Sequence, residues 1–357
     1  MKNKVLFITA SLGRGGAETQ LIKVALFLKS MQYTVKIISL TPINEFEIDY
    51  EKEGIPVIFL RSWKGNFCSN LRALYAITKN YKPDVVIAFM FIAIIFARLL
   101  KILFKFKLIS SIRIATLPRK WYIPFKITNG LDDEIVYNSV ASKIDFEKKR
   151  LVSIRGKVIH NSISIPKKED ILNVKSIDFV WICVAHFRWN KDYKTLFRAI
   201  AKLKELNFRV DIIGGLNEKY LSWAELMIKD LEIESHVRIL GFKSNTQTYL
   251  HRSDAFVLSS FSEGMPNALL EAMANEKPVV VTDIRCNRLI LESAKCGFLS
   301  EKENPEDLAG KMKTVMELST KERLILGQKG RTYIEENFSE DLIMQHWLSA
   351  VKSLATA

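Results

Sequence analysis

Two glutamates, one on either side of a predicted turn, are the residues of this chain whose types and spacing best suit them to bind a ligand. Glu263 precedes the turn, and Glu271 lies about one helical turn inside a predicted helix. Pro266 is expected to fix the first turn of that helix and Asn267 to cap it, so that backbone N–H groups there can bind phosphate oxygens. Paired carboxylates accept hydrogen bonds from vicinal hydroxyls, which hexoses and riboses both present. The pattern predicts a nucleotide-sugar site that comprises Glu263, Gly264, Met265, Pro266, Asn267, Ala268, Leu269 and Glu271.

The segments around this turn place it at the edge of a predicted sheet. Residues 254–261 have the pattern of a buried strand that ends in small polar residues, and residues 278–283 have the pattern of another strand. Open α/β sheets bind their ligands at the carboxyl ends of such strands. An ordinary capped surface helix is the alternative, but the surrounding pattern favours a ligand site.

In this setting the chain resembles the retaining glycosyltransferases of family 4, which are also described as glycosyl transferases group 1. Their signature is a Glu, seven residues and a second Glu, within Ser-x-x-Glu-Gly-x-Pro, and it corresponds here to Ser260, Glu263, Gly264, Pro266 and Glu271. The resemblance implies the GT-B fold, an α/β fold in which two Rossmann-like parallel-sheet domains face a central cleft and a C-terminal helix crosses back to the first domain. It also implies that Glu263 holds the sugar hydroxyls of the donor and that Glu271 holds its ribose.

Residues 184–192 resemble the diphosphate loop of this family, Gly-Arg-x-x-x-x-Lys. Lys191 matches the lysine of that loop, while the arginine position falls on His186. Arg188 lies two residues further on, and its longer guanidinium can reach the same oxygens, so either side chain is a candidate partner of Lys191 at the diphosphate. Gly214, at the end of the next predicted strand, completes the expected donor site. The resemblance makes Glu263, Lys191 and Arg188 the expected catalytic residues.

A glycine-rich loop follows the first predicted strand. Gly13, Gly15 and Gly16 lie between that strand and a helix, so their backbone allows a phosphate or a sugar to approach closely. The spacing differs from that of a dinucleotide fingerprint. It resembles the Gly-Gly-x-Glu loop that faces the cleft in family 4 enzymes, and a plain strand-to-helix turn is the alternative.

Part of the family pattern is missing from the first half of the chain. Residues 88–93 contain no counterpart of the His that the family often has there, which leaves the catalytic group on the acceptor side unassigned. Arg113 and Asn138 match the family loosely and are expected to be structural. The chain has no D-x-D motif and no His, Asp or Glu cluster at metal spacing, so neither a metal nor a cofactor is expected, and the nucleotide-sugar is a substrate.

Alternating strand and helix patterns divide the chain into two α/β halves. Predicted strands lie near residues 5–10, 34–39, 57–60, 85–89, 108–111 and 134–138, and then near 179–185, 209–214, 237–240, 255–259 and 278–282. We therefore expect an acceptor-binding domain at residues 1–165, joined by a crossover helix at 340–357, and a nucleotide-sugar-binding domain at residues 177–339. The polar residues 165–176 are the expected linker.

The chain of 357 residues has a net charge of +14, and the whole excess lies in its first half. Residues 1–170 hold 28 Lys and Arg against 14 Asp and Glu, whereas residues 171–357 hold 25 of each kind. Rings and cations are interleaved at residues 63–64, 104–107 and 119–122, as they are in membrane-interface segments. We expect a peripheral contact with an anionic membrane surface and no nucleic acid partner, with an ordinary solvated surface as the alternative.

The sequence predicts neither export nor a membrane span. The N-terminal apolar run is only about eight residues long and passes directly into the glycine loop. The apolar segment 85–100 is interrupted by Arg98 and is shorter than the roughly 20 residues of a spanning helix. Four scattered cysteines fit reduced thiols. We therefore expect a cytoplasmic protein that associates with the inner face of the membrane.

Two classes of function fit these residues. The first is a metal-independent retaining glycosyltransferase that moves a hexose or N-acetylhexosamine from a nucleotide-sugar to a glycan precursor, either lipid-linked or of the lipopolysaccharide or capsule type. The second is a non-catalytic, degenerate family member that binds anionic membrane or nucleic acid. The intact pair Glu263 and Glu271 and the matching Lys191 favour the enzyme, whereas the missing His mildly favours the binding protein.

Overall fold

The computed structural model describes residues 3–167, 178–215 and 218–355. These residues form two compact units, each built around its own sheet. The first unit comprises Met1–Ser162 and Glu340–Ala357, and the second comprises Ile163–Ser339. The expected linker at residues 165–176 falls mostly outside the described residues.

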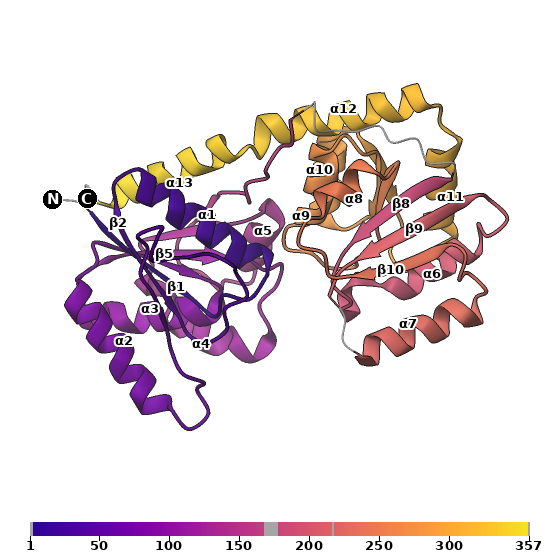
Figure 1. The fold of residues 1–357 in the computed structure, drawn as a ribbon. Coiled ribbons are helices and arrows are strands. Elements are labelled where there is room, and N and C mark those ends of the chain that lie inside the picture. The colour runs from indigo at the N-terminus through magenta and orange to yellow at the C-terminus, as the bar shows by residue number, and fades with distance from the viewer. Residues whose placement is uncertain (1–2, 168–177, 216–217, 356–357) are drawn as a thin grey trace. The chain divides into compact units, whose positions relative to one another are not determined.

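The first unit contains a seven-stranded parallel sheet in the order β3-β2-β1-β4-β5-β6-β7 (Figure 1). Its strands are β1 (Lys4–Thr9), β2 (Thr34–Ser39), β3 (Val57–Phe59), β4 (Val85–Phe89), β5 (Lys107–Ile112), β6 (Glu134–Tyr137) and β7 (Lys157–Val158). Its helices are α1 (Gly16–Ser30), α2 (Phe67–Tyr81), α3 (Phe91–Leu103), α4 (Tyr122–Ile127), α5 (Val140–Lys148) and α13 (Glu340–Ala355).

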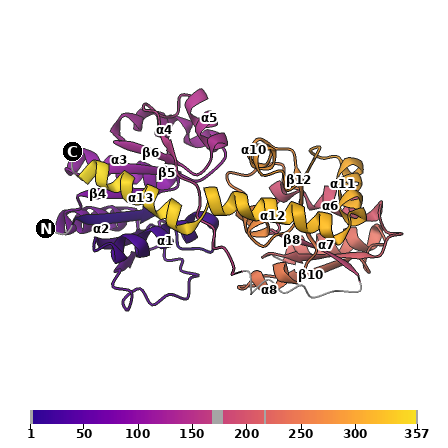
Figure 2. The same ribbon diagram turned by 90° about the horizontal axis from the view of Figure 1, so that it is seen from above.

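Helices cover both faces of this sheet. Every residue of β4 is buried, which is the pattern of a parallel strand with helices on both sides. One face packs against α1 and α13, where Trp347 is fully buried and stacks on Phe89 with ring centroids 5.7 Å apart. The other face packs against α2, α3, α4 and α5 through residues such as Leu74 and Phe125. The C-terminal helix therefore belongs to the first unit, as expected, and contacts α1 (Figure 2).

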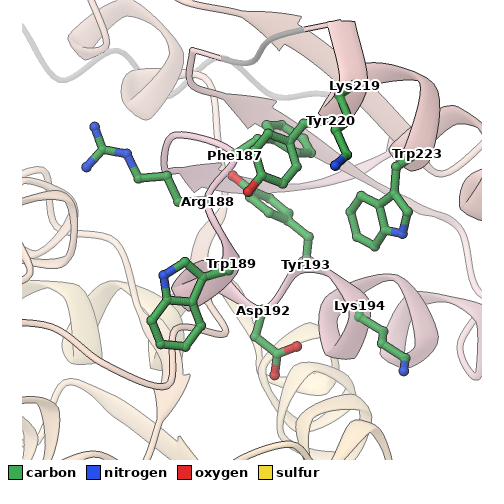
Figure 3. Close-up of a pocket in the computed structure, with 9 residues that line it drawn as sticks. All are labelled: Phe187, Arg188, Trp189, Asp192, Tyr193, Lys194, Lys219, Tyr220 and Trp223. Atoms are coloured by element: carbon green, nitrogen blue, oxygen red, sulfur yellow. The ribbon is translucent and has the colours of Figure 1, made fainter.

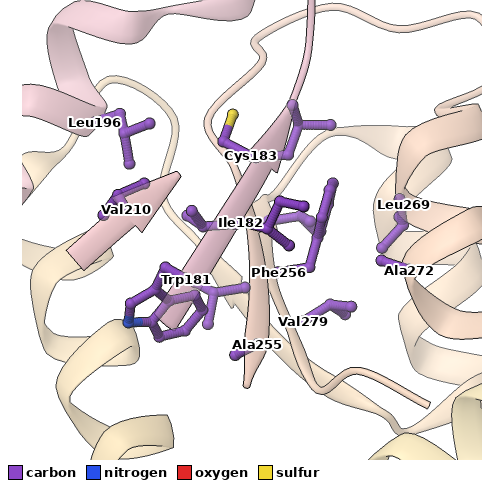
Figure 4. Packing of buried hydrophobic residues seen from close by; sticks show 14 of the residues in the cluster. Trp181, Ile182, Cys183, Leu196, Val210, Ala255, Phe256, Leu269, Ala272 and Val279 are labelled. Carbon is purple, nitrogen blue, oxygen red and sulfur yellow. The ribbon is translucent and has the colours of Figure 1, made fainter. Parts of the chain in front are cut away.

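The second unit contains a six-stranded parallel sheet in the order β10-β9-β8-β11-β12-β13. Its core is one cluster in which Trp181, Phe256 and Leu269 are fully buried (Figure 4). The strands are β8 (Phe179–Val184), β9 (Phe208–Ile213), β10 (Val237–Gly241), β11 (Ala255–Leu258), β12 (Val279–Thr282) and β13 (Gly297–Ser300). The helices are α6 (Tyr193–Ala201), α7 (Glu218–Asp230), α8 (Gln247–His251), α9 (Asn267–Ala274), α10 (Arg285–Ala294), α11 (Pro305–Glu317) and α12 (Thr320–Asn337).

Both sheets are doubly wound, because the strand order reverses in the middle. β1 pairs with β4 in the first sheet, and β8 pairs with β11 in the second. The crossovers that leave such a pair run to opposite sides, so the loops at the carboxyl ends part and leave room for a ligand. The expected architecture of two parallel-sheet α/β domains is confirmed.

The structure also contains elements that the sequence pattern did not predict. These are the short edge strands β7 and β13 and the helices α4 and α10. Among the helices that the structure describes, none is long and apolar enough to cross a membrane.

Candidate functional site

The candidate site lies at the carboxyl ends of β8 and β11, the neighbouring strands at the switch point of the second sheet. After β8 the chain forms a loop and the short 3-10 helix η4 (Trp189–Lys191) before α6 begins. After β11 it forms the turn that contains Glu263 and leads into α9. Pairing of the two strands brings together two of the expected donor-binding segments.

Hydrogen bonds join these two loops into one framework. The side-chain amide of Asn190 donates to the carbonyl of Ser262 over 2.9 Å, and the N–H of Phe261 donates to the carbonyl of Asn190 over 3.0 Å. Ser259 Oγ donates to the carbonyl of Lys191 over 2.9 Å. Sequence reasoning did not assign Asn190 or Ser259 to the site, because their partners lie about 70 positions away and only the strand pairing brings them together.

Lys191 and Glu263 form an ion pair within this framework. Lys191 Nζ lies 2.5 Å from Glu263 Oε1, and the two side chains are 19% and 10% exposed. The sequence assigns these side chains to different parts of a donor, the diphosphate and the sugar. Since the structure places them in direct contact, a donor that binds either one has to share it with the other or displace it.

Cys286, on α10, supports the backbone of Glu263. Its thiol donates a hydrogen bond to the carbonyl of Glu263, with the sulfur 3.6 Å from the oxygen. Burial, followed by the negative charge of Glu263, raises the pKa of Cys286 to about 12. The thiol therefore stays protonated at neutral pH and remains a donor. Cys286 lies 23 positions after Glu263 without any recognisable motif, so no sequence signal pointed to it.

The helix that follows the turn is not capped as predicted. α9 begins at Asn267, Pro266 is its N-cap residue, and no side chain makes a capping hydrogen bond there. The prediction that Asn267 caps the helix is therefore wrong, because Asn267 already lies in the first turn and Pro266 has no side-chain acceptor. No acidic residue lies in that turn either, so the positive end of the helix dipole faces the turn without a carboxylate from α9 beside it.

The other residues expected along α9 differ in what they can offer a ligand. Glu271 is half-buried, and its backbone carbonyl accepts a hydrogen bond from the side chain of Asn275. Leu269 is fully buried in the core, so only its backbone is available to a ligand. Met265 and Ala268 are partly buried and pack against the same core.

His186 and Gly214 connect the loops that follow β8 and β9. His186 Nδ1 accepts a hydrogen bond from the N–H of Gly215 over 2.9 Å. A ring nitrogen that accepts this bond carries no proton, so the imidazole is neutral with its hydrogen on Nε2 and offers one donor, where a guanidinium offers several. Gly214 packs so closely that a Cβ atom would lie 1.9 Å from the carbonyl oxygen of Ala185. Both residues therefore have structural roles beside any role at the donor.

A cavity of about 350 Å³ opens beside this loop, between the starts of α6 and α7 (Figure 3). Phe187 and Tyr193 line it with rings stacked 4.0 Å apart, and Trp189, which is 73% exposed, stands on its rim. Arg188 also lines the cavity but extends away from Trp223 and Lys219, which lie on the opposite side (Figure 3). Arg188 is exposed and lies one 3-10 turn before Lys191, whose N–H donates to its carbonyl.

The remaining residues singled out from the sequence belong to the first unit. Gly15 is the N-cap residue of α1 and Gly16 is its first helical residue. The loop is anchored by the N–H of Arg14, which donates to Glu45 Oε2 over 2.8 Å. That Gly13, Gly15 and Gly16 face a ligand stays a prediction.

Arg113 and Asn138 have structural partners. Arg113 is buried after β5, and its guanidinium donates to Ser111 Oγ over 2.8 Å and to Asn161 Oδ1 over 3.0 Å. Burial lowers the pKa of Arg113 to about 9. Asn138 Oδ1 accepts from Ser142 Oγ over 3.3 Å. Within the part of the chain that the structure describes, no group of three or more His, Cys, Asp and Glu side chains could hold a metal ion.

Comparison with known proteins finds similarity over the unit that contains this site. Residues 164–333 match the family described as Glycosyl transferases group 1. Bacillus subtilis EpsD, named a putative glycosyltransferase, is 32% identical over 160 residues, which cover 43% of this chain and 40% of that protein. A Campylobacter jejuni protein named N-acetylgalactosamine-N,N'-diacetylbacillosaminyl-diphospho-undecaprenol 4-alpha-N-acetylgalactosaminyltransferase is 27% identical, over 52% of this chain and 51% of that protein. These matches span about half the length of the curated relatives or less.

A solved structure resembles the chain over nearly its whole length. Anabaena HepE, in complex with UDP-glucose, superposes with a TM-score of 0.86 at 20% identity and covers 98% of this chain and 99% of its own. At this identity the likeness concerns the fold, and the expected GT-B fold is confirmed.

Proposed function

We propose that this chain, whose residues 164–333 belong to the glycosyl transferases group 1 family, is a glycosyltransferase that moves a sugar from a UDP-sugar to a lipid-linked glycan precursor. The observation that carries the proposal is the pairing of Lys191 with Glu263 at the switch point of the second sheet. Ligands of doubly wound sheets bind there. The family match includes both residues.

Each donor group would meet a different part of this framework. Glu271 would accept hydrogen bonds from the ribose hydroxyls, and Glu263 from the hydroxyls of the transferred sugar. Lys191 would meet the diphosphate, with Arg188 or the Nε2–H of His186 as its partner. The solved relative HepE binds UDP-glucose, which supports uridine as the nucleotide.

The chemistry would run with retention at the anomeric carbon. The bond between that carbon and the diphosphate oxygen breaks, the acceptor hydroxyl forms the new glycosidic bond, and its proton passes to the departing diphosphate. Negative charge then builds on the diphosphate, where the ammonium of Lys191 and the first turn of α9 lower the barrier. No protein base on the acceptor side is required in this scheme, which accommodates the missing His in residues 88–93.

The proposed acceptor follows from the relatives. The Campylobacter protein is named for a diphospho-undecaprenol acceptor, and an Escherichia coli relative at 32% identity over 138 residues is named for another. A saccharide carried on such a lipid would require this chain to work at the cytoplasmic face of a membrane, as the basic first half also suggests.

The alternative of a non-catalytic binding protein is not favoured. The family match and the names of the relatives point to sugar transfer.

The test is a thermal-shift panel of UDP-glucose, UDP-galactose, UDP-N-acetylglucosamine and UDP-N-acetylgalactosamine, followed by a transfer assay with the sugar that stabilises the protein. A true donor raises the melting temperature by mass action. Lys191→Ala should lower kcat/KM at least about 100-fold, while Lys204→Ala, which removes an exposed lysine of the same unit, should not. If no UDP-sugar shifts the melting temperature, the proposed donor is wrong. Near-normal kinetics of Lys191→Ala would remove that residue from the mechanism.

A further inference from the structure

Three helices on one face of the first sheet carry apolar side chains that point outward. We call this set the apolar face. Most of these residues lie three or four positions from another member on the same helix, so they gather on one side of that helix. Ile123 and Ile127 are 74% and 78% exposed, the largest fractions among them. The apolar face consists of Phe67, Leu71 and Tyr75 on α2, Leu99, Ile102 and Leu103 on α3, and Ile123 and Ile127 on α4.

The three helices that carry the apolar face cover the same side of the sheet, and contacts link α2 to the end of α3 and α3 to α4. Tyr75 on α2 contacts Phe104 at the end of α3, with ring centroids 5.1 Å apart. α3 in turn contacts α4, and all three cover the same face of the sheet (Figure 1). Single exposed apolar residues are ordinary in soluble proteins, but eight of them on three helices of one side of the sheet indicate an interaction surface.

A buried ion pair fixes the outward orientation of α4. Arg98, on α3, and Asp132 are both fully buried at their side chains, and the guanidinium donates two hydrogen bonds to the carboxylate. The same guanidinium donates to the carbonyl of Phe125 over 2.9 Å, and the ring of Phe125 is buried beneath α4. With Phe125 held inside, Ile123 and Ile127 have no inward position to occupy.

The surroundings of the apolar face are strongly cationic. Residues 54–131 contain thirteen Lys and Arg but only one acidic residue, Asp84, whose carboxylate accepts the N–H of Lys4 over 2.7 Å. The exposed cations of this segment are Arg61, Lys64, Arg72, Lys79, Lys82, Lys105, Arg119, Lys120 and Lys126. Aliphatic side chains beside an excess of exposed cations form the pattern of a surface that enters the interface of an anionic bilayer.

We propose that the apolar face inserts into an anionic membrane, with the surrounding cations bound to lipid headgroups. A nucleic acid would use the cations but would leave the isoleucines and leucines of α3 and α4 without partners, since bases stack on aromatic rings. A bilayer uses both features at once. The contact deepens the proposed function, because it would bring α3 and α4 to the membrane that carries the acceptor, and it rests on that function only for the identity of the acceptor.

The test is flotation of the full chain with vesicles of phosphatidylcholine alone or with about 30% phosphatidylglycerol added. We expect binding to the anionic vesicles only. Ile123→Ser combined with Ile127→Ser should weaken it by at least about tenfold, and Lys120→Gln with Lys126→Gln should also weaken it. The matched control is Leu324→Ser with Ile325→Ser, two residues of α12 in the second unit that are 44% and 43% exposed and should not matter.

A second measurement uses the thiol of Cys68, which is exposed on α2 next to Phe67, whereas the other three cysteines are buried. Anionic vesicles should slow the reaction of Cys68 with a water-soluble thiol reagent, and neutral vesicles should not. Unchanged binding of the double isoleucine variant, equal binding to neutral vesicles, or binding to a single-stranded oligonucleotide in place of vesicles would each overturn the proposal. Thermal shift by UDP-sugar, measured on the same variants, reports the donor site separately.

Discussion

Replacing Glu263 by Gln should distinguish its ion pair with Lys191 from its proposed contact with the transferred sugar. From the residue roles alone, this variant would leave the affinity for UDP unchanged, because Glu263 is assigned to the sugar. The ion pair changes that expectation, since UDP has to compete with the Glu263 carboxylate for Lys191 at 2.5 Å. Hydrogen bonds to charged groups contribute about 1.5–3 kcal/mol, and the amide would retain part of that interaction. If the net release is about 1 kcal/mol, the variant should bind UDP about fivefold more tightly.

The assay is calorimetry with UDP alone, run beside steady-state kinetics on the same preparations. Glu263→Gln should show the lower dissociation constant for UDP together with a reduced kcat, because the contact to the transferred sugar is weakened during the reaction. Glu232→Gln is the control, since it removes a carboxylate from an exposed pair with Lys204 at 2.7 Å. Equal or weaker UDP binding by Glu263→Gln would refute the reasoning from the ion pair.

Three further expectations concern stability and reactivity. Gly214→Ala should lower the free energy of unfolding by about 1–3 kcal/mol, because the added Cβ would lie 1.9 Å from the carbonyl oxygen of Ala185. Gly310→Ala, in open space on α11, should raise the free energy of unfolding by up to about 1 kcal/mol. Urea titration compares the two variants, and equal effects would contradict the packing argument. Burial lowers the pKa of Lys277 from 10.5 to about 8, so the unfolded chain binds more protons between these values and the free energy of unfolding should rise with pH across that window. In urea titrations, the free energy of unfolding of Lys277→Met should rise less between about pH 7.5 and about pH 9.5 than that of the parent chain. Parallel plots of this free energy against pH would exclude Lys277 as the cause. Burial raises the pKa of Cys183, Cys286 and Cys296 to about 12. An aromatic disulfide reagent near neutral pH should therefore modify Cys68 alone in the native protein and all four thiols in denaturant. Rapid modification of a second thiol in the native protein would contradict this prediction.

The sequence was sufficient where the burial pattern follows a regular period. The strand over β4 and the helix over α13 could both be located, because their apolar residues recur as a buried strand or a core-facing helix requires. α10 was missed because its buried side includes the polar Asn287, which donates to the carbonyl of Thr282. α4 was missed for the opposite reason, since Ile123 and Ile127 face outward and only Phe125 faces the core.

The candidate site was predictable residue by residue but not in its contacts. Glu263 and Lys191 were found from local motifs, each on its own segment. That they pair with each other depends on β8 and β11 being neighbours, which a local motif does not contain. The prediction that Asn267 caps α9 was wrong because residue preference alone does not tell whether the helix begins before or after this residue.

The position of α13 has a consequence for the order of folding during synthesis. The helix completes the first unit, where Ile343, Met344, Trp347 and Val351 are buried, yet it is made after the whole of the second unit. Residues 163–339 form an uninterrupted stretch and can close their core as soon as they leave the ribosome. The first sheet emerges earlier together with α1, but the part of its surface that packs against α13 stays uncovered until that helix is made. The nascent chain should therefore finish its second unit first and expose the α13 side of β1 and β4 to chaperones meanwhile.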